Sequence, residues 1–464
     1  MSSPAQKIIP CTTSHLALPA YVDIQSLYER HVPRYTSYPT AVEFADGDFN
    51  TPVLASLNTQ HQPISLYIHI PFCQSLCNYC GCNKRITQDK SKADIYLDYL
   101  ANEMRQISAV SPSLKVSHIH YGGGSPSFLT QAQHSRLYEL INVNFILLEG
   151  VQQSIECDPR NLTPDYIQHL ADLGFRRLSL GVQDVNATVQ QTINRIQSTD
   201  HIQNCITHAY ASGFTSINID LIVGLPEQNT STIEETLLAV QRFNCERISV
   251  FNYAHLPARF PSQRKFEKAN VPTIAEKKAM TQQIAKGLSA LGYQKIGLDH
   301  FAKHDDTLTK ALEAGTLSRN FQGYTSDNND QILGLGVSAI SNIGNTRSQN
   351  NVDLTKYYEQ ITQSQLRHRG ISLTQDDLFR GQIISQLMCN FSVDLAHIAK
   401  QFHLNIDTYL HNELAQLQAL SQLDVLTIEA NKVSVNQDHR PLIRVIASVF
   451  DRYLQSHHSF SSVI

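Results

Sequence analysis

Short apolar runs alternate with amphipathic stretches along the first two thirds of the chain. Six of these runs have the length of buried strands: residues 66–70, 116–121, 151–158, 177–183, 216–223 and 247–254. Stretches with helical spacing separate them, such as residues 91–109, in which Tyr96 and Leu100 lie on one face. Because alternation of strand and helix is typical of a parallel sheet, we predict an α/β fold, an incomplete (β/α)6 barrel similar to a TIM barrel.

Several helix starts are marked by residues that can cap a helix. Thr130 with Gln133, and Thr273 with Glu276, have the spacing of a capping box, in which each side chain bonds to the backbone of the other residue. Thr163 precedes a proline, which is the arrangement of an N-cap followed by the first helical residue. We therefore expect helices to begin directly after these three threonines.

The remaining residues lie before and after this alternation of predicted strands and helices. Residues 297–350 are irregular and rich in glycine. From about residue 354 the pattern is helical, with a small hairpin at residues 425–428 and 433–435 and a last helix that reaches about residue 455. We predict three parts: an N-terminal extension or lid over residues 1–60, a barrel domain over residues 61–350, and a smaller, mainly helical, winged-helix-like domain over residues 351–464.

Residues 33–40 form a proline-bounded, tyrosine-rich segment in the N-terminal part. Proline holds the residue before it in an extended conformation, so we expect an extended segment here. It has two interpretations: a strap that lies across the body of the domain, or a lid that excludes water from an active site.

Charge and composition narrow the class of protein. The net charge is −4, with 37 Lys and Arg against 41 Asp and Glu, so we expect no nucleic-acid partner and no membrane surface. Residues 390–464 carry five Lys and Arg against seven Asp and Glu, which argues against the DNA-binding role that a winged-helix shape suggests. We find no readable secretory signal and no apolar run long enough to span a membrane. The nine cysteines are an odd number and mostly isolated, so we expect a cytoplasmic protein.

Four of the nine cysteines lie within ten residues. Cys73, Cys77 and Cys80 have the spacing C-x3-C-x2-C directly after the first apolar run, and Cys82 follows them. Three thiolates on one loop can hold three irons of a cubane cluster and leave the fourth iron open to a substrate. This spacing after a buried strand is the signature of the radical S-adenosylmethionine enzymes. A four-cysteine zinc site is the alternative, but Cys80 and Cys82 are separated by one residue, a poor bite for a tetrahedral ion.

Each of the six predicted strands ends in glycine or polar residues. In barrels of this kind the active site lies at the C-terminal ends of the strands. Besides the cysteine loop, these ends carry residues 123–125, Glu156, Asp158, Gln183, Asp184, Asp220, Tyr253 and His255. We therefore predict that these residues share one pocket.

Residue types suggest roles within that pocket. Glycines 122 to 124 let backbone amides approach the carboxylate of a ligand closely. Glu156 can accept hydrogen bonds from the ammonium group or hydroxyls of a cofactor. Arg195 is suited to a bidentate contact with a carboxylate, although an arbitrary arginine more often lies on a solvated helix face.

The chain resembles one family nearly from end to end, the oxygen-independent coproporphyrinogen III oxidases of haem biosynthesis. The segments that carry the resemblance are residues 33–40, 67–84, 122–127, 181–184, 218–226, 249–257, 299–302, 320–324 and 389–391. The resemblance implies the radical S-adenosylmethionine fold and chemistry that the cysteine spacing already favours.

The resemblance also implies two kinds of cofactor. One [4Fe-4S] cluster would be held by Cys73, Cys77 and Cys80, with Cys82 in the motif but not bound to iron. Of two S-adenosylmethionine molecules, the cluster-bound one would contact Tyr67, Gly123, Glu156 and Ile340, and the backbone of Tyr79 would contact the adenine of one of them. The second molecule would be held by Gly124, Ser125, Gln183, Arg195, Asp220 and Ala254.

The reaction that the resemblance implies is the oxidative decarboxylation of two propionates of coproporphyrinogen III to vinyl groups, giving protoporphyrinogen IX. A 5′-deoxyadenosyl radical would remove the hydrogen, and no acid or base in the chain is assigned. The substrate carries four carboxylates, and Arg34, Lys84 and Arg195 are candidates to bind them. We expect an electron donor such as flavodoxin or ferredoxin, and a monomer.

Two other functions remain open at this stage. The related haem chaperones keep the cysteine triplet, but they lack the continuation at residues 81–84 and the segment at residues 33–40, both of which are present here. A radical enzyme that acts on a different substrate is the third possibility. We therefore expect the oxidase.

Overall fold

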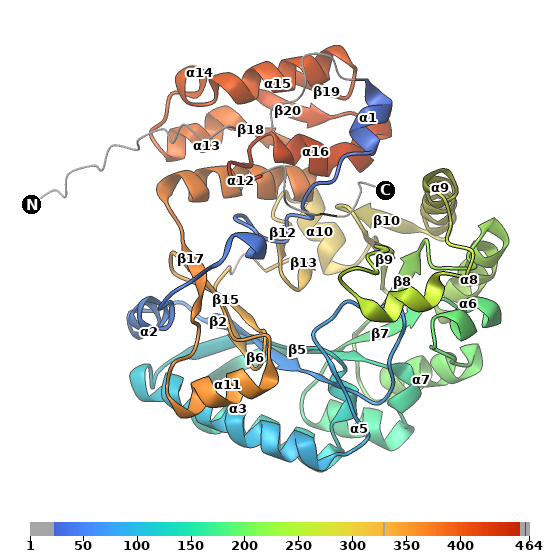
Figure 1. Ribbon diagram of the computed structural model, residues 1–464, viewed down its shortest axis with the longest axis vertical. Helices are drawn as coiled ribbons and strands as arrows, with labels where there is room; N and C mark the ends of the chain where they lie inside the picture. Colours follow the sequence, from blue (N-terminus) through green and yellow to red (C-terminus); the bar gives the residue numbers. More distant parts are fainter. Residues whose placement is uncertain (1–22, 328–329, 455–459, 461–464) are drawn as a thin grey trace, which may run out of the picture.

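One long sheet forms the body of the protein (Figure 1). The structure, a computed structural model, describes residues 23–327, 330–454 and 460. In these residues the largest sheet has 13 strands, and the seven strands at its middle are parallel. In spatial order they are β14 (Ile332–Leu335), β2 (Ile64–Ile70), β5 (Lys115–Gly123), β6 (Ile146–Cys157), β7 (Arg177–Gln183), β8 (Ser216–Val223) and β9 (Arg247–Asn252).

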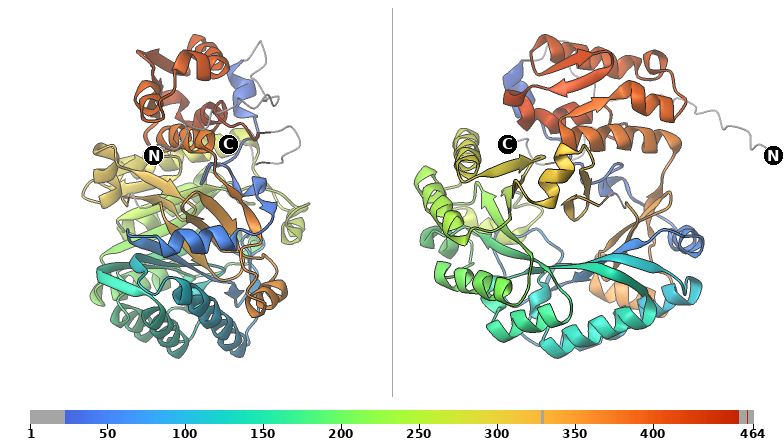
Figure 2. Two further views of the ribbon diagram at one scale, coloured as in Figure 1. Left: turned by 90° about the vertical axis from the view of Figure 1, so that its left-hand side faces the viewer. Right: turned by 180° about the vertical axis from the view of Figure 1, so that it is seen from behind.

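Helices cover the outer face of this curved sheet and pack against one another in chain order (Figures 1 and 2). They are α3 (Ser91–Val110), α4 (Gln131–Asn144), α5 (Pro164–Asp172), α7 (Thr199–Ala211), α8 (Thr230–Phe243) and α9 (Ile274–Ala290). The sheet remains open, because its outermost strands β1 (Ala45–Asp46) and β10 (Tyr293–Ile296) each have one neighbour. The predicted α/β fold, an incomplete barrel with a smaller helical domain, is confirmed.

The three predicted helix starts are found where capping residues mark them. The Thr130 and Gln133 side chains form a capping box at α4, and Thr273 and Glu276 form one at α9. The Thr163 hydroxyl accepts a hydrogen bond from a backbone N–H in the first turn of α5. Local hydrogen bonding therefore sets these boundaries, as the sequence predicted.

The prediction that residues 297–350 are irregular was wrong. This stretch contains β11 (His300–Lys303), α10 (Thr307–Glu313), β12 (Ser318–Asn320), β13 (Gly323–Thr325), β14, β15 (Ile340–Ile343) and β16 (Thr346–Gln349). Strands of three or four residues are too short to show a periodic pattern, so their pairing is decided by the sheet they join. At Gly334 in β14, a Cβ atom would lie 2.4 Å from the carbonyl oxygen of Ile340. Glycine is therefore needed for close packing, as we expected there.

The C-terminal part forms a second hydrophobic core above the sheet (Figure 1). Its elements are α12 (Gln375–Asn390), α13 (Leu395–Gln401), α14 (Ile406–Tyr409), α15 (His411–Gln422), α16 (Ile443–Ser448), β18 (Ser392–Asp394), β19 (Leu426–Glu429) and β20 (Lys432–Val435). The predicted hairpin is β19–β20, to which β18 adds a third strand. The last helix ends at Ser448 rather than near residue 455, because the chain turns into bends at residues 452 and 453.

The segment at residues 33–40 joins the two cores. On one side Leu27 of α1 (Ile24–Tyr28) and Tyr35 and Tyr38 belong to the C-terminal core, and the Tyr35 hydroxyl donates to Asp451 at 2.9 Å. On the other side Arg347 of β16 in the long sheet donates to the Pro39 carbonyl at 3.5 Å. Just beyond the segment, β1 pairs with β17 (Arg369–Ser372) at the edge of this sheet. This contact with both cores fits the strap interpretation. Among the helices the structure describes, none combines the length and apolar character that crossing a bilayer requires.

The buried carboxylate of Glu103 connects α3 to residues that follow β14 in the chain. Glu103 is fully buried, and its Oε2 accepts hydrogen bonds from the Gly336 backbone N–H at 2.8 Å and the Tyr357 hydroxyl at 2.7 Å. Its Oε1 accepts from Asn350 Nδ2 at 2.8 Å and lies 3.5 Å from the Arg367 guanidinium, which is also buried. These bonds fix the turn after β14 next to the strand that precedes the cysteine loop.

Replacing Glu103 with alanine should lower the free energy of unfolding by about 3–5 kcal/mol, because the buried charge of Arg367 would lose its partner. Urea denaturation followed by circular dichroism measures the change. Glu139→Ala on the exposed face of α4 is the matched control and should shift stability by less than about 0.5 kcal/mol. Equal losses in both variants would contradict the role given to Glu103.

Candidate active site

The cysteine loop is fastened to the end of the parallel sheet at several points. It begins with β3 (Phe72–Cys73), which pairs in parallel with β4 (Arg85–Ile86). Asn78 donates from its backbone and from its side chain to two carbonyls at the end of α6 (Ala187–Thr192) and just beyond it, both at 3.0 Å. The Asn194 side-chain amide donates to the Leu76 carbonyl of the loop at 2.7 Å. The loop is therefore positioned by the segment that follows β7.

Two arginines and a carboxylate surround the buried thiol of Cys77. The Arg195 guanidinium donates to Cys77 Sγ at 3.4 Å and to Asp158 at 3.1 Å. The Arg160 guanidinium lies 3.8 Å from the same sulfur and donates to Asp158 at 2.6 Å. Burial acts to raise the pKa of Asp158, but Arg195 and Arg160 hold it below its ordinary value. The ionised carboxylate therefore orients both cations toward the sulfur.

The three thiols of the triplet are close enough to influence one another. Burial, followed by the charges of Cys80 and Cys77, raises the pKa of Cys73 to about 12. A hydrogen bond from the Cys82 thiol lowers the pKa of Cys80 to about 6, against burial and with help from Lys84. Lys84 Nζ also donates to the Cys80 carbonyl at 2.8 Å. Three thiols on one loop with cations nearby are a donor set that suits a cluster of positively charged irons.

The fourth cysteine of the loop is placed differently from Cys77, whose thiol is buried. Cys82 is exposed at the rim, and its thiol serves as the partner of Cys80.

Four of the predicted cofactor residues line one cavity of about 320 Å³ beside the cysteine loop. They are Tyr67 in β2, Gly123 in β5, Glu156 in β6 and Ile340 in β15. Cys82 lies in the same cavity wall. The structure thus brings together residues that are up to 273 positions apart in the chain.

Glu156 is held ionised inside this cavity. Its Oε1 lies 3.0 Å from His120 Nε2, and the His120 ring stacks on Tyr67 at 6.0 Å. Burial acts to raise the pKa of Glu156, but the hydrogen bond and charge of His120 and the Gly123 amide hold it below its ordinary value. The carboxylate is therefore an acceptor for a cationic or hydroxyl group of a ligand.

Two glycines after β5 allow the close approach of backbone and loop. Gly123 has φ +112°, and a Cβ there would lie 2.6 Å from the His69 ring. At Gly124 a Cβ would lie 2.8 Å from the Pro71 carbonyl, just before the cysteine loop. A side chain at either position would push the loop away from the sheet.

The six residues predicted for a second cofactor do not share one cavity. Ser125 is buried and lies 2.9 Å from the Ser127 hydroxyl. Gln183 has φ +69° at the end of β7, and its amide lies with the Arg195 guanidinium against Gly181. Gly124 lies beside them at the start of the cysteine loop, through its N–H to the Ile70 carbonyl at 2.9 Å.

The two remaining residues line separate cavities. Asp220 lies in the barrel interior, where it accepts from Ser179 at 2.9 Å and Asn218 at 2.8 Å. Burial, with the charge of Glu156, raises the pKa of Asp220 to about 6. Ala254 follows β9 and borders a cavity nearer the C-terminal domain.

One residue that the sequence did not reveal connects two predicted contacts. The Gln263 amide nitrogen donates to the Tyr79 carbonyl at 3.0 Å and to the Ala254 carbonyl at 3.2 Å. Its oxygen accepts from the Leu256 N–H at 2.6 Å, and the side chain is buried. No periodicity marks Gln263, because it lies in the irregular turn at residues 261–266. Arg160 was missed for the same reason, since it lies in a single turn after β6.

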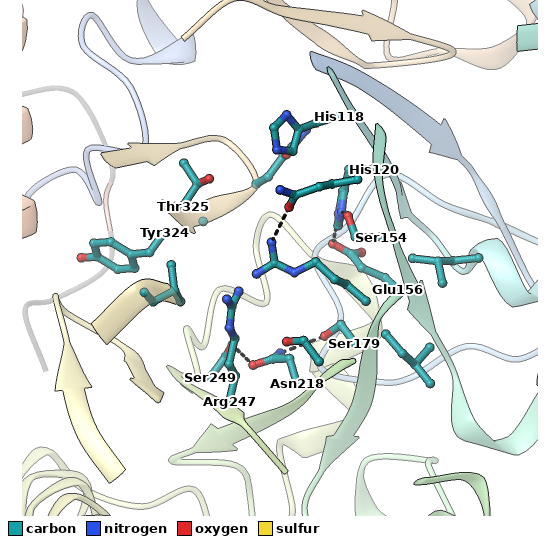
Figure 3. Close-up of a pocket in the computed structure, with 18 of the residues that line it drawn as sticks. His118, His120, Ser154, Glu156, Ser179, Asn218, Arg247, Ser249, Tyr324 and Thr325 are labelled. Atoms are coloured by element: carbon teal, nitrogen blue, oxygen red, sulfur yellow. Dashed lines mark hydrogen bonds and ion pairs between the residues drawn. The ribbon is translucent and has the colours of Figure 1, made fainter. Parts of the chain in front are cut away.

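The interior of the barrel is a polar cavity of about 330 Å³. Figure 3 shows His120, Ser154 and Glu156 on one wall and Ser179, Asn218 and Ser249 on another, with Tyr324 and Thr325 of the β12–β13 hairpin facing them. The hairpin tip at residues 321 and 322 also borders the cavity of Tyr67 and Glu156. Glu156 and Gln322 line both cavities, so the two are neighbours.

The fold and this site define the chain as a member of the radical S-adenosylmethionine class. Residues 67–240 match the Radical SAM superfamily, and residues 373–440 match the HemN C-terminal domain. The match to the superfamily spans the cysteine loop and the strands from β5 to β8.

Relatives of similar length narrow the assignment. The oxygen-independent coproporphyrinogen III oxidase of Escherichia coli K12 is 44% identical over 431 residues, covering 92% of this chain and 94% of that protein. The enzyme of that name from Pseudomonas aeruginosa is 39% identical over 451 residues, covering 95% and 98%. The solved structure of the E. coli radical SAM enzyme matches with a TM-score of 0.88 at 42% identity, covering 92% of this chain and 100% of that chain. The chain therefore belongs to the oxygen-independent coproporphyrinogen III oxidase family.

Serine in place of Cys77 should abolish the visible absorbance of an iron–sulfur cluster, because we expect this thiol to be one of the three that bind the irons. Iron content and absorbance of anaerobically reconstituted protein are the measurements. The matched control is Cys82→Ser, which should keep its iron, since Cys82 acts through Cys80. Full iron content in Cys77→Ser, or complete loss in Cys82→Ser, would refute the assignment of ligands.

Proposed function

We propose that this protein is an oxygen-independent coproporphyrinogen III oxidase, which converts two propionates of coproporphyrinogen III to vinyl groups and gives protoporphyrinogen IX in haem biosynthesis. The observation that carries the proposal is the thiol triplet on the loop that borders the cavity of Tyr67 and Glu156, in a chain that matches enzymes of this name over at least 92% of its length. The haem-chaperone alternative is not favoured, because these relatives are named as oxidases.

Cys73, Cys77 and Cys80 would hold a [4Fe-4S] cluster with one open iron. Such a cluster and S-adenosylmethionine, when bound, supply a 5′-deoxyadenosyl radical that removes a hydrogen atom from a carbon of the substrate. The chain's own contribution is electrostatic. Arg195 and Arg160 lie against the Cys77 sulfur, and Asp158 keeps both cations in place.

Glu156, Gly123, Tyr67 and Ile340 would bind the cofactor that docks on the open iron. The ionised Glu156 would accept hydrogen bonds from its ammonium group or hydroxyls, and the backbone at Gly123 would approach it closely. The walls formed by Tyr67 and Ile340 would exclude water from the reactive carbon.

A second S-adenosylmethionine would be held by Gly124, Ser125, Gln183, Arg195, Asp220 and Ala254, and Tyr79 would contact an adenine through its backbone. The bonds from Gln263 to the Tyr79 and Ala254 carbonyls support this proposal, since they fix two of these contacts relative to each other. The apposition of Gln183 and Arg195 at Gly181 supports it as well.

The remaining requirements follow from the reaction. An electron donor such as flavodoxin or ferredoxin would reduce the cluster, and we propose that the protein acts as a monomer in the cytoplasm. The isolated cysteines and the near balance of acidic and basic residues, with a net charge of −4, support a reducing compartment and a small-molecule substrate rather than a nucleic acid or membrane surface.

Anaerobic turnover tests the function directly. Reconstituted protein with coproporphyrinogen III, S-adenosylmethionine and a chemical reductant should form protoporphyrinogen IX, detected after oxidation by chromatography of the porphyrins. Cys77→Ser should give no product. Stable haem binding without vinyl product would instead favour the chaperone, and cleavage of S-adenosylmethionine with untouched coproporphyrinogen would indicate another substrate.

A further inference from the structure

A cavity of about 200 Å³ at the end of β9 is lined by basic residues. Arg34 of the strap, Lys277 of α9 and Arg444 of α16 contribute to its wall, together with His31 and His255. No Asp or Glu is among the described residues that line it. A cavity wall with this charge attracts an anion.

Arg34 is a half-buried cation of this cavity and has no carboxylate partner among the described residues. Its guanidinium lies over the Phe251 ring at 5.9 Å and makes no ion pair or hydrogen bond with the residues that the structure describes. Its backbone is nevertheless fixed, because Arg319 donates to its carbonyl and Arg444 donates to the carbonyl of Pro33 just before it. The side chain is thus held in place with its donors unused.

The nearest acidic group is already occupied. The charge of Asp299 acts to raise the pKa of Arg34. However, the two carboxylate oxygens of Asp299 lie 2.8 Å from His300 Nδ1 and 3.7 Å from the Arg319 guanidinium. Burial is the main effect on Arg34 and lowers its pKa, as expected for a guanidinium that has lost water without gaining an anion at hydrogen-bond distance.

Lys277 provides a second cation in the wall of this cavity. Its ammonium group lies 5.8 Å from the centre of the Tyr253 ring, and no carboxylate in the described part of the chain pairs with it. Burial lowers its pKa. Two cations from segments 243 positions apart therefore face one small cavity without a counterion.

The other cations considered for the substrate are used elsewhere. Lys84 donates to the Cys80 carbonyl at 2.8 Å, which fixes the cysteine loop. Arg195 donates to the Gly181 carbonyl, to Asp158 and to Cys77 Sγ. Most donors of these two side chains are therefore already used within the protein.

The position of the cavity connects it with the active site. Residues 252–256, which line it, directly follow β9, so it lies at the same C-terminal end of the parallel strands as the cysteine loop. Ala254 belongs to its wall, and Gln263 bonds both the Ala254 and Tyr79 carbonyls. The strap that carries Arg34 closes the cavity from the side of the C-terminal domain.

We propose that Arg34 and Lys277 form a carboxylate-binding subsite at the end of β9. This proposal rests on the proposed function, in which the carboxylate has two sources. It is either a propionate of the porphyrinogen or the α-carboxylate of a second S-adenosylmethionine. Arg34 provides paired donors for such a group, and Lys277 adds a point charge. The subsite gives the strap a role in holding a ligand as well as in joining the two cores.

Equilibrium binding of coproporphyrin III to the cluster-loaded protein, followed by porphyrin fluorescence, tests the propionate source. Arg34→Gln and Lys277→Met should each weaken binding about tenfold, since each removes one charge-assisted contact. Lys286→Met, the same change on the exposed face of α9, should leave binding unchanged. The tetramethyl ester of the porphyrin, which has no carboxylates, should bind the protein and all variants alike.

Equilibrium dialysis with labelled S-adenosylmethionine tests the other source. Weaker porphyrin binding with unchanged cofactor binding assigns the subsite to a propionate, and the reverse pattern assigns it to the cofactor. Unchanged binding of both ligands in Arg34→Gln and Lys277→Met overturns the proposal. If the unmodified protein binds no coproporphyrin III, the proposed function is in question, while the cofactor measurement still decides the subsite.

Discussion

The structure depends on keeping a buried thiol beside two positive charges at the mouth of an open barrel. Cys77 lies against Arg195 and Arg160, and both arginines are oriented by the single carboxylate of Asp158. Because a buried ion without a partner is costly, these four side chains stabilise one another only as a set. The set also joins the loop after β2 to the ends of β6 and β7, so the cysteine loop is positioned by the sheet as well as by its own contacts.

Electrostatic and steric constraints also act at the other strand ends. Glu156 is held ionised by His120, and the glycines after β5 remove every side chain that would separate the sheet from the cysteine loop. On the opposite side the strap and the C-terminal domain share one core, which places the basic cavity of Arg34 and Lys277 over the end of β9. A ligand with several carboxylates would thus contact cations at the end of β9 and also reach the cavity of Tyr67 and Glu156 at the neighbouring strand ends.

The sequence predicted those features that depend on a long apolar run or on a motif within one loop. The apolar runs that form β2 and β5 to β9 are buried on at least one face over six or more residues, and the cysteine spacing lies within one loop. It missed β14 and β15, whose four residues gain their conformation from pairing with β2 and with each other. It also missed Gln263 and Arg160, because their roles arise from distant carbonyls and a distant sulfur that no spacing reveals.

The measurement that tests the central claim most directly is the electron paramagnetic resonance spectrum of the reduced, reconstituted protein before and after S-adenosylmethionine is added. A cluster held by three thiolates leaves one iron open, so the signal should change when the cofactor coordinates that iron, and the protein should contain about four irons per chain and no zinc. An unchanged spectrum from a cluster closed by a fourth thiolate, or protein that holds zinc in this loop, would contradict the account.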